Sequence, residues 1–272
     1  MKRILRGAGI WPDRIGHGGT LDPLATGVLP IAIGEATKLA GRMLDATKGY
    51  DFTVQWGAAT ATEDAEGAVT ATSAVRPTEA GIAAIVPQFT GAIAQVPPAY
   101  SALKIDGKRA YALARAGEVV ELAVRHITVH SLALLSTTPD SATFSASVSK
   151  GTYIRSLARD IALALGTVGH VAMLRRTKAG PFSLDQAISL DKFALCVQGT
   201  ALEQVLLPLM AGLDDIPALS IDPDEAAALR LGRRLFGHPA KPGTYLACLG
   251  SVPVALVEID PEAVRVLRGF NL

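Results

Sequence analysis

The chain has 272 residues, of which 49% are hydrophobic and 5% aromatic, and a formal net charge of +1. This length lies near the size, about 250 to 300 residues, at which a single hydrophobic core stops growing, so we expect one large domain with a small appendage. No apolar run approaches the roughly 18 residues of a membrane span, and charges interrupt residues 1–14. We therefore expect a soluble, cytoplasmic protein that has no contact with a membrane.

Two cysteines, Cys196 and Cys248, lie far apart in the sequence, and the five histidines include no pair with the spacing of a zinc protease. This pattern argues against a disulfide framework and against a zinc site, so we expect buried thiols and no metal.

Positive charge is concentrated in two stretches of the chain. Residues 1–48 carry seven Lys or Arg against four Asp or Glu, and residues 150–180 carry six against one. Residues 49–75 carry none against four, and residues 181–272 carry seven against eleven. Because neutralising phosphate requires a basic surface, a polyanion is expected to bind at the two positive stretches.

The first distinctive segment is GHGGTLDPLATGVLPI, residues 16–31, which contains a single acid, Asp22. Gly18 and Gly19 permit turn conformations that are closed to other residues, while Pro23 fixes its own φ and pushes Asp22 toward an extended conformation. The segment is therefore expected to be a loop that holds one carboxylate in place. The alternative from these residues alone is that Asp22 caps a turn or a helix.

A helix, a strand and a loop are expected after this segment. Apolar residues with helical period predict a helix over Glu35–Asp45. From Tyr50 to Trp56, aromatic and apolar residues alternate with polar ones, which predicts a strand with its aromatic residues on one face. Residues 57–67 are polar and acidic and are expected to form a loop.

The middle of the chain continues with helices and strands in irregular order. The sequence predicts helices at Thr78–Val86, Lys108–Ala116 and Tyr153–Leu165, and strands within Val119–Leu135 and Ala142–Val148. This order predicts the α+β class, with flanking helices on a mixed or mostly antiparallel sheet. Since neither a glycine-rich dinucleotide fingerprint nor a Walker-type loop occurs, we expect no nucleotide cofactor.

The last third of the chain, from residue 183, shows a different pattern of expected elements. Ser183–Met210 is expected to be helical, and Asp222, Pro223 and Glu225 form a capping-box pattern that predicts a short helix over Pro223–Leu231. Short strands are expected around Tyr245–Leu249, Pro253–Ile259 and Val264–Leu267. We therefore expect a large domain over residues 1–212 and a small β-rich domain over residues 213–272.

Four blocks of the sequence carry a family resemblance. They are residues 16–31, Lys48-Gly49-Tyr50 at the start of a strand, QVPPAYSALK at residues 95–104, and KGTYIR at residues 150–155. Together and in this order they resemble the TruB family of tRNA pseudouridine-55 synthases, from about residue 16 to residue 182.

The resemblance implies the pseudouridine synthase fold with a small PUA-like domain at the C-terminus. It further implies that a uridine in the T-loop of tRNA, at position 55, is isomerised to pseudouridine after base flipping, without a cofactor. The expected partner is the T-stem-loop of tRNA. No protein partner is expected to be required, and the chain is expected to be a monomer.

The resemblance also implies catalytic residues. Asp22 matches the catalytic aspartate, which either attacks the sugar or stabilises an electron-poor sugar carbon. Arg155 matches the arginine that pairs with this aspartate, and a guanidinium fork would orient the carboxylate. Tyr50 matches the tyrosine that stacks on the target base and is a candidate base for proton transfer. Without the resemblance, Arg155 would be read as a surface residue on a helix and Tyr50 as an apolar ring on a strand.

Five further residues are expected to contact substrate. His17 occupies a position that the family uses near the flipped nucleotide, and Leu174 resembles the apolar wall of the uracil pocket. Lys150, Arg175 and Arg176 are expected to contact phosphate. From the residues alone, His17 would be a hydrogen-bonded loop residue, Leu174 a core residue, and the two arginines part of a solvated helix face.

Two departures from the family pattern are visible. The family's opening strand and its lysine-proline segment have no counterpart in residues 1–15. We therefore expect a shortened N-terminus, either because the chain starts at an internal methionine or because an edge strand is lost, with consequences for stability and activity. Gly18 also stands where the family more often has threonine.

Two other functions remain as alternatives. The first is a catalytically impaired protein that binds or folds tRNA. The second is a hydrolytic glycosidase. A glycosidase usually needs two carboxylates across one bond. The acidic cluster of Glu63, Asp64 and Glu66 is expected to lie in a loop without a clear partner for Asp22.

Overall fold

The computed structural model describes residues 1–199 and 201–272, which divide into two compact units. One unit comprises Met1–Gly18, Pro30–Met43 and Gln186–Leu272, and the other comprises Gly19–Leu29 and Leu44–Asp185. Within the described residues, no helix has the length and apolarity needed to cross a membrane. We call the two units the first and the second unit.

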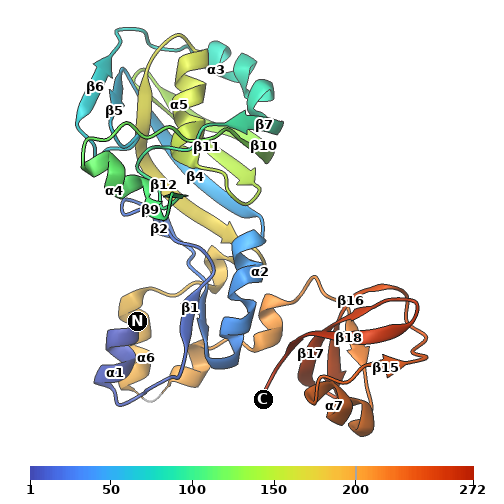
Figure 1. Cartoon of the computed structure of the whole chain (residues 1–272). Coiled ribbons are helices and arrows are strands. Elements are labelled where there is room, and N and C mark those ends of the chain that lie inside the picture. Colours follow the sequence, from blue (N-terminus) through green and yellow to red (C-terminus); the bar gives the residue numbers. More distant parts are fainter. Residues whose placement is uncertain (200) are drawn as a thin grey trace. The chain divides into compact units, whose positions relative to one another are not determined.

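The second unit is built on a seven-stranded sheet (Figure 1). The strand order is β13 (Phe182–Ser183), β12 (Gly169–Ala179), β4 (Lys48–Trp56), β11 (Ser141–Val148), β10 (Arg125–Thr138) and β7 (Gly91–Gln95). All neighbours in this order are antiparallel, and the short strand β2 (Thr26–Gly27) pairs with β12 in parallel. The expected α+β class with a mixed, mostly antiparallel sheet is therefore confirmed.

One face of this sheet forms the main hydrophobic core. Phe52, Val54 and Trp56 alternate along β4 and are buried, and the Phe52 ring stacks on Phe144 with centroids 5.4 Å apart. Helix α5 (Ile154–Ala164) buries its apolar stripe in the same cluster, as does α3 (Glu79–Ile85) through Ile82. The strand expected from Tyr50 and the helix expected over residues 153–165 are confirmed.

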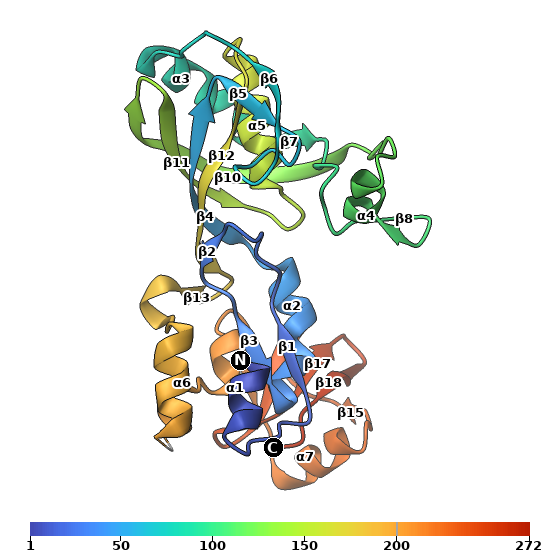
Figure 2. The same ribbon diagram turned by 90° about the vertical axis from the view of Figure 1, so that its left-hand side faces the viewer.

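Smaller elements extend from the sheet. They are β5 (Ala58–Thr60), β6 (Val69–Thr72), η2 (Val86–Phe89), β8 (Lys104–Ile105), β9 (Lys108–Arg109) and α4 (Ala110–Arg115). The segment with β8, β9 and α4 protrudes from the sheet (Figure 2). The helix expected over residues 108–116 begins later, because residues 108–109 pair with β8, and the strand expected from residue 119 begins at residue 125.

Strand β12 was not expected from the sequence. Its alternation is interrupted by register shifts after Val171 and after Arg176, and the arginine is buried where a strand pattern calls for an apolar residue. A solvated helix face at Arg175 and Arg176 is therefore the wrong interpretation, since both residues lie on this strand.

The first unit contains short helices around a two-stranded sheet. Its elements are α1 (Lys2–Gly7), β1 (Ile15–His17), β3 (Ile31–Ile33), η1 (Gly34–Leu39), α6 (Leu190–Gln198), η4 (Leu202–Val205) and η5 (Leu209–Gly212). The helix expected over residues 35–45 consists of the 3₁₀ helix η1 followed by α2 (Ala40–Asp45), which runs past the end of this unit.

The stretch over residues 183–210, which is expected to be helical, contains several separate helices. The described part of this stretch begins with η3 (Leu184–Gln186), and Ser189 then starts α6 by accepting a hydrogen bond from the Lys192 backbone N–H at 3.1 Å. Pro208 lies just before η5, and residue 200 lies outside the described residues. The described residues of this stretch therefore form short helices in place of one long helix.

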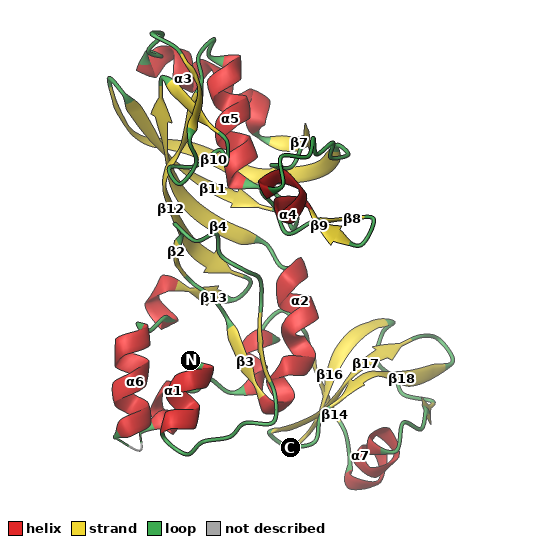
Figure 3. Cartoon of the chain, turned by 60° about the vertical axis from the view of Figure 1, so that its left-hand side comes forward, coloured by secondary structure: helices red, strands yellow, loops and turns green. Residues whose placement is uncertain are grey.

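The C-terminal part of the first unit is a five-stranded sheet with one helix (Figure 3). The order is β14 (Ala218–Ser220), β16 (Gly243–Leu249), β17 (Val252–Ile259), β18 (Ala263–Gly269) and β15 (Leu235–Phe236). Helix α7 (Pro223–Arg230) starts with the expected capping box, in which Asp222 and Glu225 bind each other's backbone N–H at 2.8 and 3.0 Å. The β-rich character is confirmed, and the boundary after residue 212 stays a prediction.

Candidate active site

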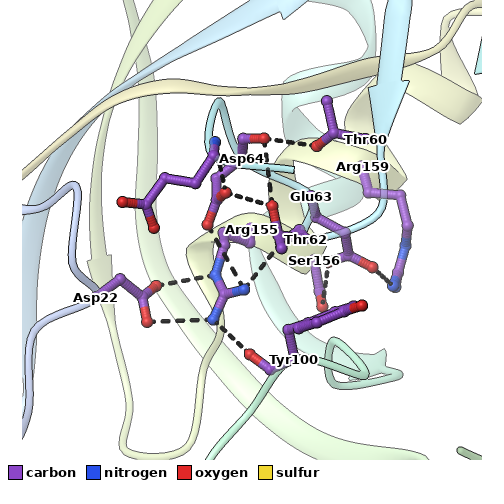
Figure 4. A network of polar contacts seen from close by, with 10 residues as sticks. Asp22, Thr60, Thr62, Glu63, Asp64, Tyr100, Arg155, Ser156 and Arg159 are labelled. Atoms are coloured by element: carbon purple, nitrogen blue, oxygen red, sulfur yellow. Dashed lines mark hydrogen bonds and ion pairs between the residues drawn. The ribbon is translucent and has the colours of Figure 1, made fainter. Parts of the chain in front are cut away.

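The Asp22 side chain forms a bidentate ion pair with Arg155 (Figure 4). Arg155 Nε donates to Oδ2 at 2.9 Å, and Nη2 donates to Oδ1 at 3.1 Å. The turn at this point is closed by the backbone, with the Ala25 N–H donating to the Asp22 carbonyl at 2.9 Å. The Asp22 side chain is 33% exposed and that of Arg155 only 5%, so a buried arginine presents one accessible carboxylate.

Arg155 also binds two other segments of the second unit. Its Nη1 donates to the Thr62 carbonyl at 2.8 Å, and its Nη2 donates to the Tyr100 carbonyl at 3.1 Å. Arg155 is near the N-terminus of α5, and its apolar neighbours on that helix are buried in the core. The guanidinium is thus fixed by a packed helix and joins three stretches that are distant in sequence.

Asp64 is a second carboxylate beside Arg155, and no local pattern in the sequence indicates this position. Its Oδ2 lies 3.7 Å from Arg155 Nη1, while Thr62 Oγ1 donates to its Oδ1 at 2.5 Å. The side chain is 3% exposed. The acidic loop thus contacts the site through Arg155 and not through Asp22. Because Asp64 is enclosed, it does not face a substrate from the opposite side as a glycosidase carboxylate does.

The loop that carries Asp22 is anchored at both ends by Arg176. This side chain is 1% exposed, and it donates to the carbonyls of Gly19 at 3.0 Å, Thr20 at 3.2 Å and Val28 at 2.6 Å. Arg176 is expected to contact phosphate, but in the structure its donors bind loop carbonyls inside the protein. Arg176 therefore holds the loop in place.

Tyr50 lies on β4 directly opposite Arg176 on β12 and packs against the main core cluster. Burial raises the pKa of the Tyr50 phenol, although the positive charge of Arg176 acts in the opposite direction. The phenol is therefore neutral at neutral pH. A neutral ring suits stacking on a base, whereas proton abstraction by a phenolate is disfavoured.

The remaining predicted residues have different environments. Leu174 is buried in the core cluster, Arg175 is exposed on β12, and exposed Lys150 donates to Asp45 Oδ1 at 3.1 Å. His17 belongs to the first unit, where it ends β1 opposite Ile31. The substrate contacts of these four residues stay predictions.

No group of three or more His, Cys, Asp or Glu side chains is arranged to hold a metal ion among the residues that the structure describes.

Comparison with known proteins defines the family. Residues 2–154 match the family described as TruB family pseudouridylate synthase, N-terminal domain, and residues 155–214 match the tRNA pseudouridylate synthase B C-terminal domain. The tRNA pseudouridine synthase B of Novosphingobium aromaticivorans is 61% identical over 100% of this chain and 91% of its own length. That of Zymomonas mobilis is 55% identical over 100% and 89%.

Solved structures share the fold. A Cbf5-Nop10-Gar1 complex contains a chain with a TM-score of 0.74 and 26% identity, covering 99% of this chain and 79% of that one. An H/ACA RNP bound to a substrate RNA containing 2'-deoxyuridine gives a TM-score of 0.74 at 24% identity, covering 100% and 79%. The chain thus shares its fold with a chain of each of these assemblies. By its sequence matches, the chain belongs to the TruB family of pseudouridylate synthases.

Proposed function

We propose that this chain is a tRNA pseudouridine synthase that isomerises a uridine of the T-loop, at position 55, to pseudouridine. The single observation that carries the proposal is the bidentate Asp22–Arg155 pair with a partly exposed carboxylate. It is supported by relatives named tRNA pseudouridine synthase B that are 61% and 55% identical to this chain.

The proposed reaction needs no change of oxidation state. The bond between N1 of uracil and C1' of the sugar breaks, the freed base rotates, and C5 bonds to C1'. C5 then loses its proton to solvent, and N1 acquires one. Asp22 either attacks the sugar or stabilises its electron-poor carbon, and Arg155 keeps the carboxylate oriented during both bond changes.

The target base must leave its stack to reach Asp22. We assign to Tyr50 the face on which the flipped base stacks, because its ring is neutral and borders the main core cluster. Leu174 supplies the apolar wall of the pocket from the same cluster, and His17 is assigned to the flipped nucleotide by family resemblance.

A surface hollow of about 480 Å³ in the second unit supports binding of RNA. The residues that line it include Arg125, His126 and Lys150, and also the acidic Asp45. We assign phosphate contacts to Lys150 and to exposed Arg175.

The proposed organisation is a catalytic domain over residues 1–212 and a PUA-like domain over residues 213–272. The protein is proposed to act as a cytoplasmic monomer on tRNA alone.

The test is tritium release from a tRNA transcript labelled at C5 of uridine, using the purified chain alone. We expect release of one tritium per tRNA, and none from a transcript with cytidine at position 55. Binding of tRNA without tritium release would instead indicate the impaired RNA-binding protein. Appearance of free uracil would indicate a hydrolytic glycosidase.

A further inference from the structure

A second arginine of α5 forms an ion pair that the proposed mechanism does not use. Arg159 follows Arg155 by one helical turn, so the two side chains leave the same side of the helix. Arg159 Nη1 donates to Glu63 Oε1 at 2.5 Å, and Ser156 Oγ donates to Glu63 Oε2 at 3.2 Å. Both oxygens of the Glu63 carboxylate are therefore held by α5.

Glu63 and Asp64, which are adjacent in one loop, thus face successive turns of α5 (Figure 4). Glu63 points to Arg159 and Ser156, while the next residue, Asp64, lies beside Arg155. The carbonyl of the preceding residue, Thr62, also accepts from Arg155. Any movement of Glu63 along α5 would therefore move two of the groups that surround the Arg155 guanidinium.

The backbone at Glu63 is strained in a way that supports this arrangement. Its φ is +61°, in the left-handed region that residues other than glycine rarely adopt. Such a conformation persists only where surrounding contacts over-determine it, and these sites are often functional. Here the contacts include the Glu63 carbonyl, which accepts from Val171 on β12 at 3.0 Å.

Arg159 reaches the third segment around the site as well. Its Nη2 donates to the Val96 carbonyl at 3.0 Å, four residues before Tyr100, whose carbonyl accepts from Arg155 at 3.1 Å. Arg155 and Arg159, which lie one turn of α5 apart, consequently both bind the segment at residues 62–63 and the segment at residues 96–100. Only Arg155 also contacts Asp22.

From this arrangement we infer that Glu63 and Arg159 form a positioning clasp, which fixes the Arg155 guanidinium for its contact with Asp22. Neither residue of the clasp touches the reacting atoms. The pair acts through the Thr62 and Tyr100 carbonyls and the Asp64 carboxylate, which define where the Arg155 donors can lie. The inference rests on the proposed function and assigns a task to residues outside the Asp22 ion pair.

The experiment compares Glu63→Gln with Glu66→Gln, which makes the same change at an exposed side chain of the same loop. Tritium release under single-turnover conditions gives the rate, and filter binding gives the affinity for tRNA. We expect Glu63→Gln to turn over about tenfold more slowly, with a dissociation constant for tRNA within about threefold of wild type. Its unfolding temperature should stay within about 3 °C of wild type, and Glu66→Gln should match wild type throughout.

Coupling to Arg155 separates positioning from a merely structural role. If Glu63 acts through Arg155, then adding Glu63→Gln to Arg155→Lys should slow turnover by less than about twofold. Equal effects of Glu63→Gln and Glu66→Gln, additive losses in the double variant, or a Glu63→Gln protein that does not fold would each overturn the inference. A wild-type protein that binds tRNA without releasing tritium would overturn the proposed function and the clasp with it.

Discussion

Gly27 lies so close to Arg176 that a Cβ added at Gly27 would be 2.1 Å from the Arg176 carbonyl oxygen. This contact arises where β2 pairs with β12, and the same carbonyl accepts from the Val28 N–H at 2.8 Å. The Arg176 side chain binds the other end of the loop at Gly19 and Thr20. The position of Asp22 therefore depends on a backbone approach that only glycine allows.

Gly27→Ala should displace the Asp22 loop from β12 and reduce turnover by at least about a hundredfold, equivalent to roughly 2.7 kcal/mol of activation free energy. Gly91→Ala is the matched control, because Gly91 has a φ of +98° against +99° for Gly27 but nothing within 4 Å of an added Cβ. Tritium release measures both variants. Similar losses in the two would show that backbone strain, and not the contact with Arg176, causes the effect.

Arg155→Lys should lower turnover about a hundredfold, because a lysine ammonium cannot reproduce the planar fork that binds both Asp22 oxygens. The affinity for tRNA should change less than tenfold, since phosphate contacts dominate binding. Single-turnover rates and filter binding measure the two quantities separately. An affinity loss as large as the rate loss would make Arg155 a binding residue.

Tyr50→Ala should reduce turnover far more than affinity, because it removes the surface on which the flipped base is proposed to stack. Tyr50→Phe keeps the ring and should lose less than Tyr50→Ala. Since burial raises the pKa of the Tyr50 phenol, the wild-type rate should also be flat between about pH 7 and 9. A rate that rises with the phenolate over this range would instead favour Tyr50 as the base.

The stability of the protein should depend on pH through Glu63. Burial raises the pKa of the Glu63 carboxyl above its ordinary value of 4.5, although the charges of Arg159 and Arg155 and the Ser156 hydrogen bond act against this. Between the ordinary and the raised value, the folded protein binds more protons than the unfolded chain. The contribution of Glu63 to the free energy of unfolding therefore falls as pH rises through that window.

Glu63→Gln removes this dependence. Urea unfolding from pH 4 to pH 8 should show the variant gaining stability relative to wild type as pH rises above about 4.5, and then a constant difference. A difference that stays constant across the whole range would contradict the raised pKa of Glu63.

The sequence predicted the parts of the site that depend on local patterns. The Gly18-Gly19 and Pro23 neighbours of Asp22 indicated a loop that holds its acid, and the apolar stripe of residues 154–165 indicated the helix that carries Arg155. The two residues are separated by 133 positions, and their pairing was expected only from the family resemblance.

The parts that the sequence did not predict depend on contacts between distant segments. Asp64 had no visible partner, because Arg155 reaches its loop across 93 residues at the Thr62 carbonyl. Arg176 was interpreted as a phosphate contact, since nothing near it in the sequence shows that three loop carbonyls surround its guanidinium. Strand β12 was missed for the same reason, because a buried arginine disrupts its apolar alternation.

The Asp22→Asn variant tests whether the Asp22 carboxylate carries out the isomerisation. The amide keeps the shape of the side chain but removes its charge. We expect no tritium release from C5-labelled tRNA above background, with an affinity for tRNA within about tenfold of wild type. Turnover of labelled tRNA by purified Asp22→Asn at a rate near wild type would show that the Asp22 carboxylate is not required for the isomerisation.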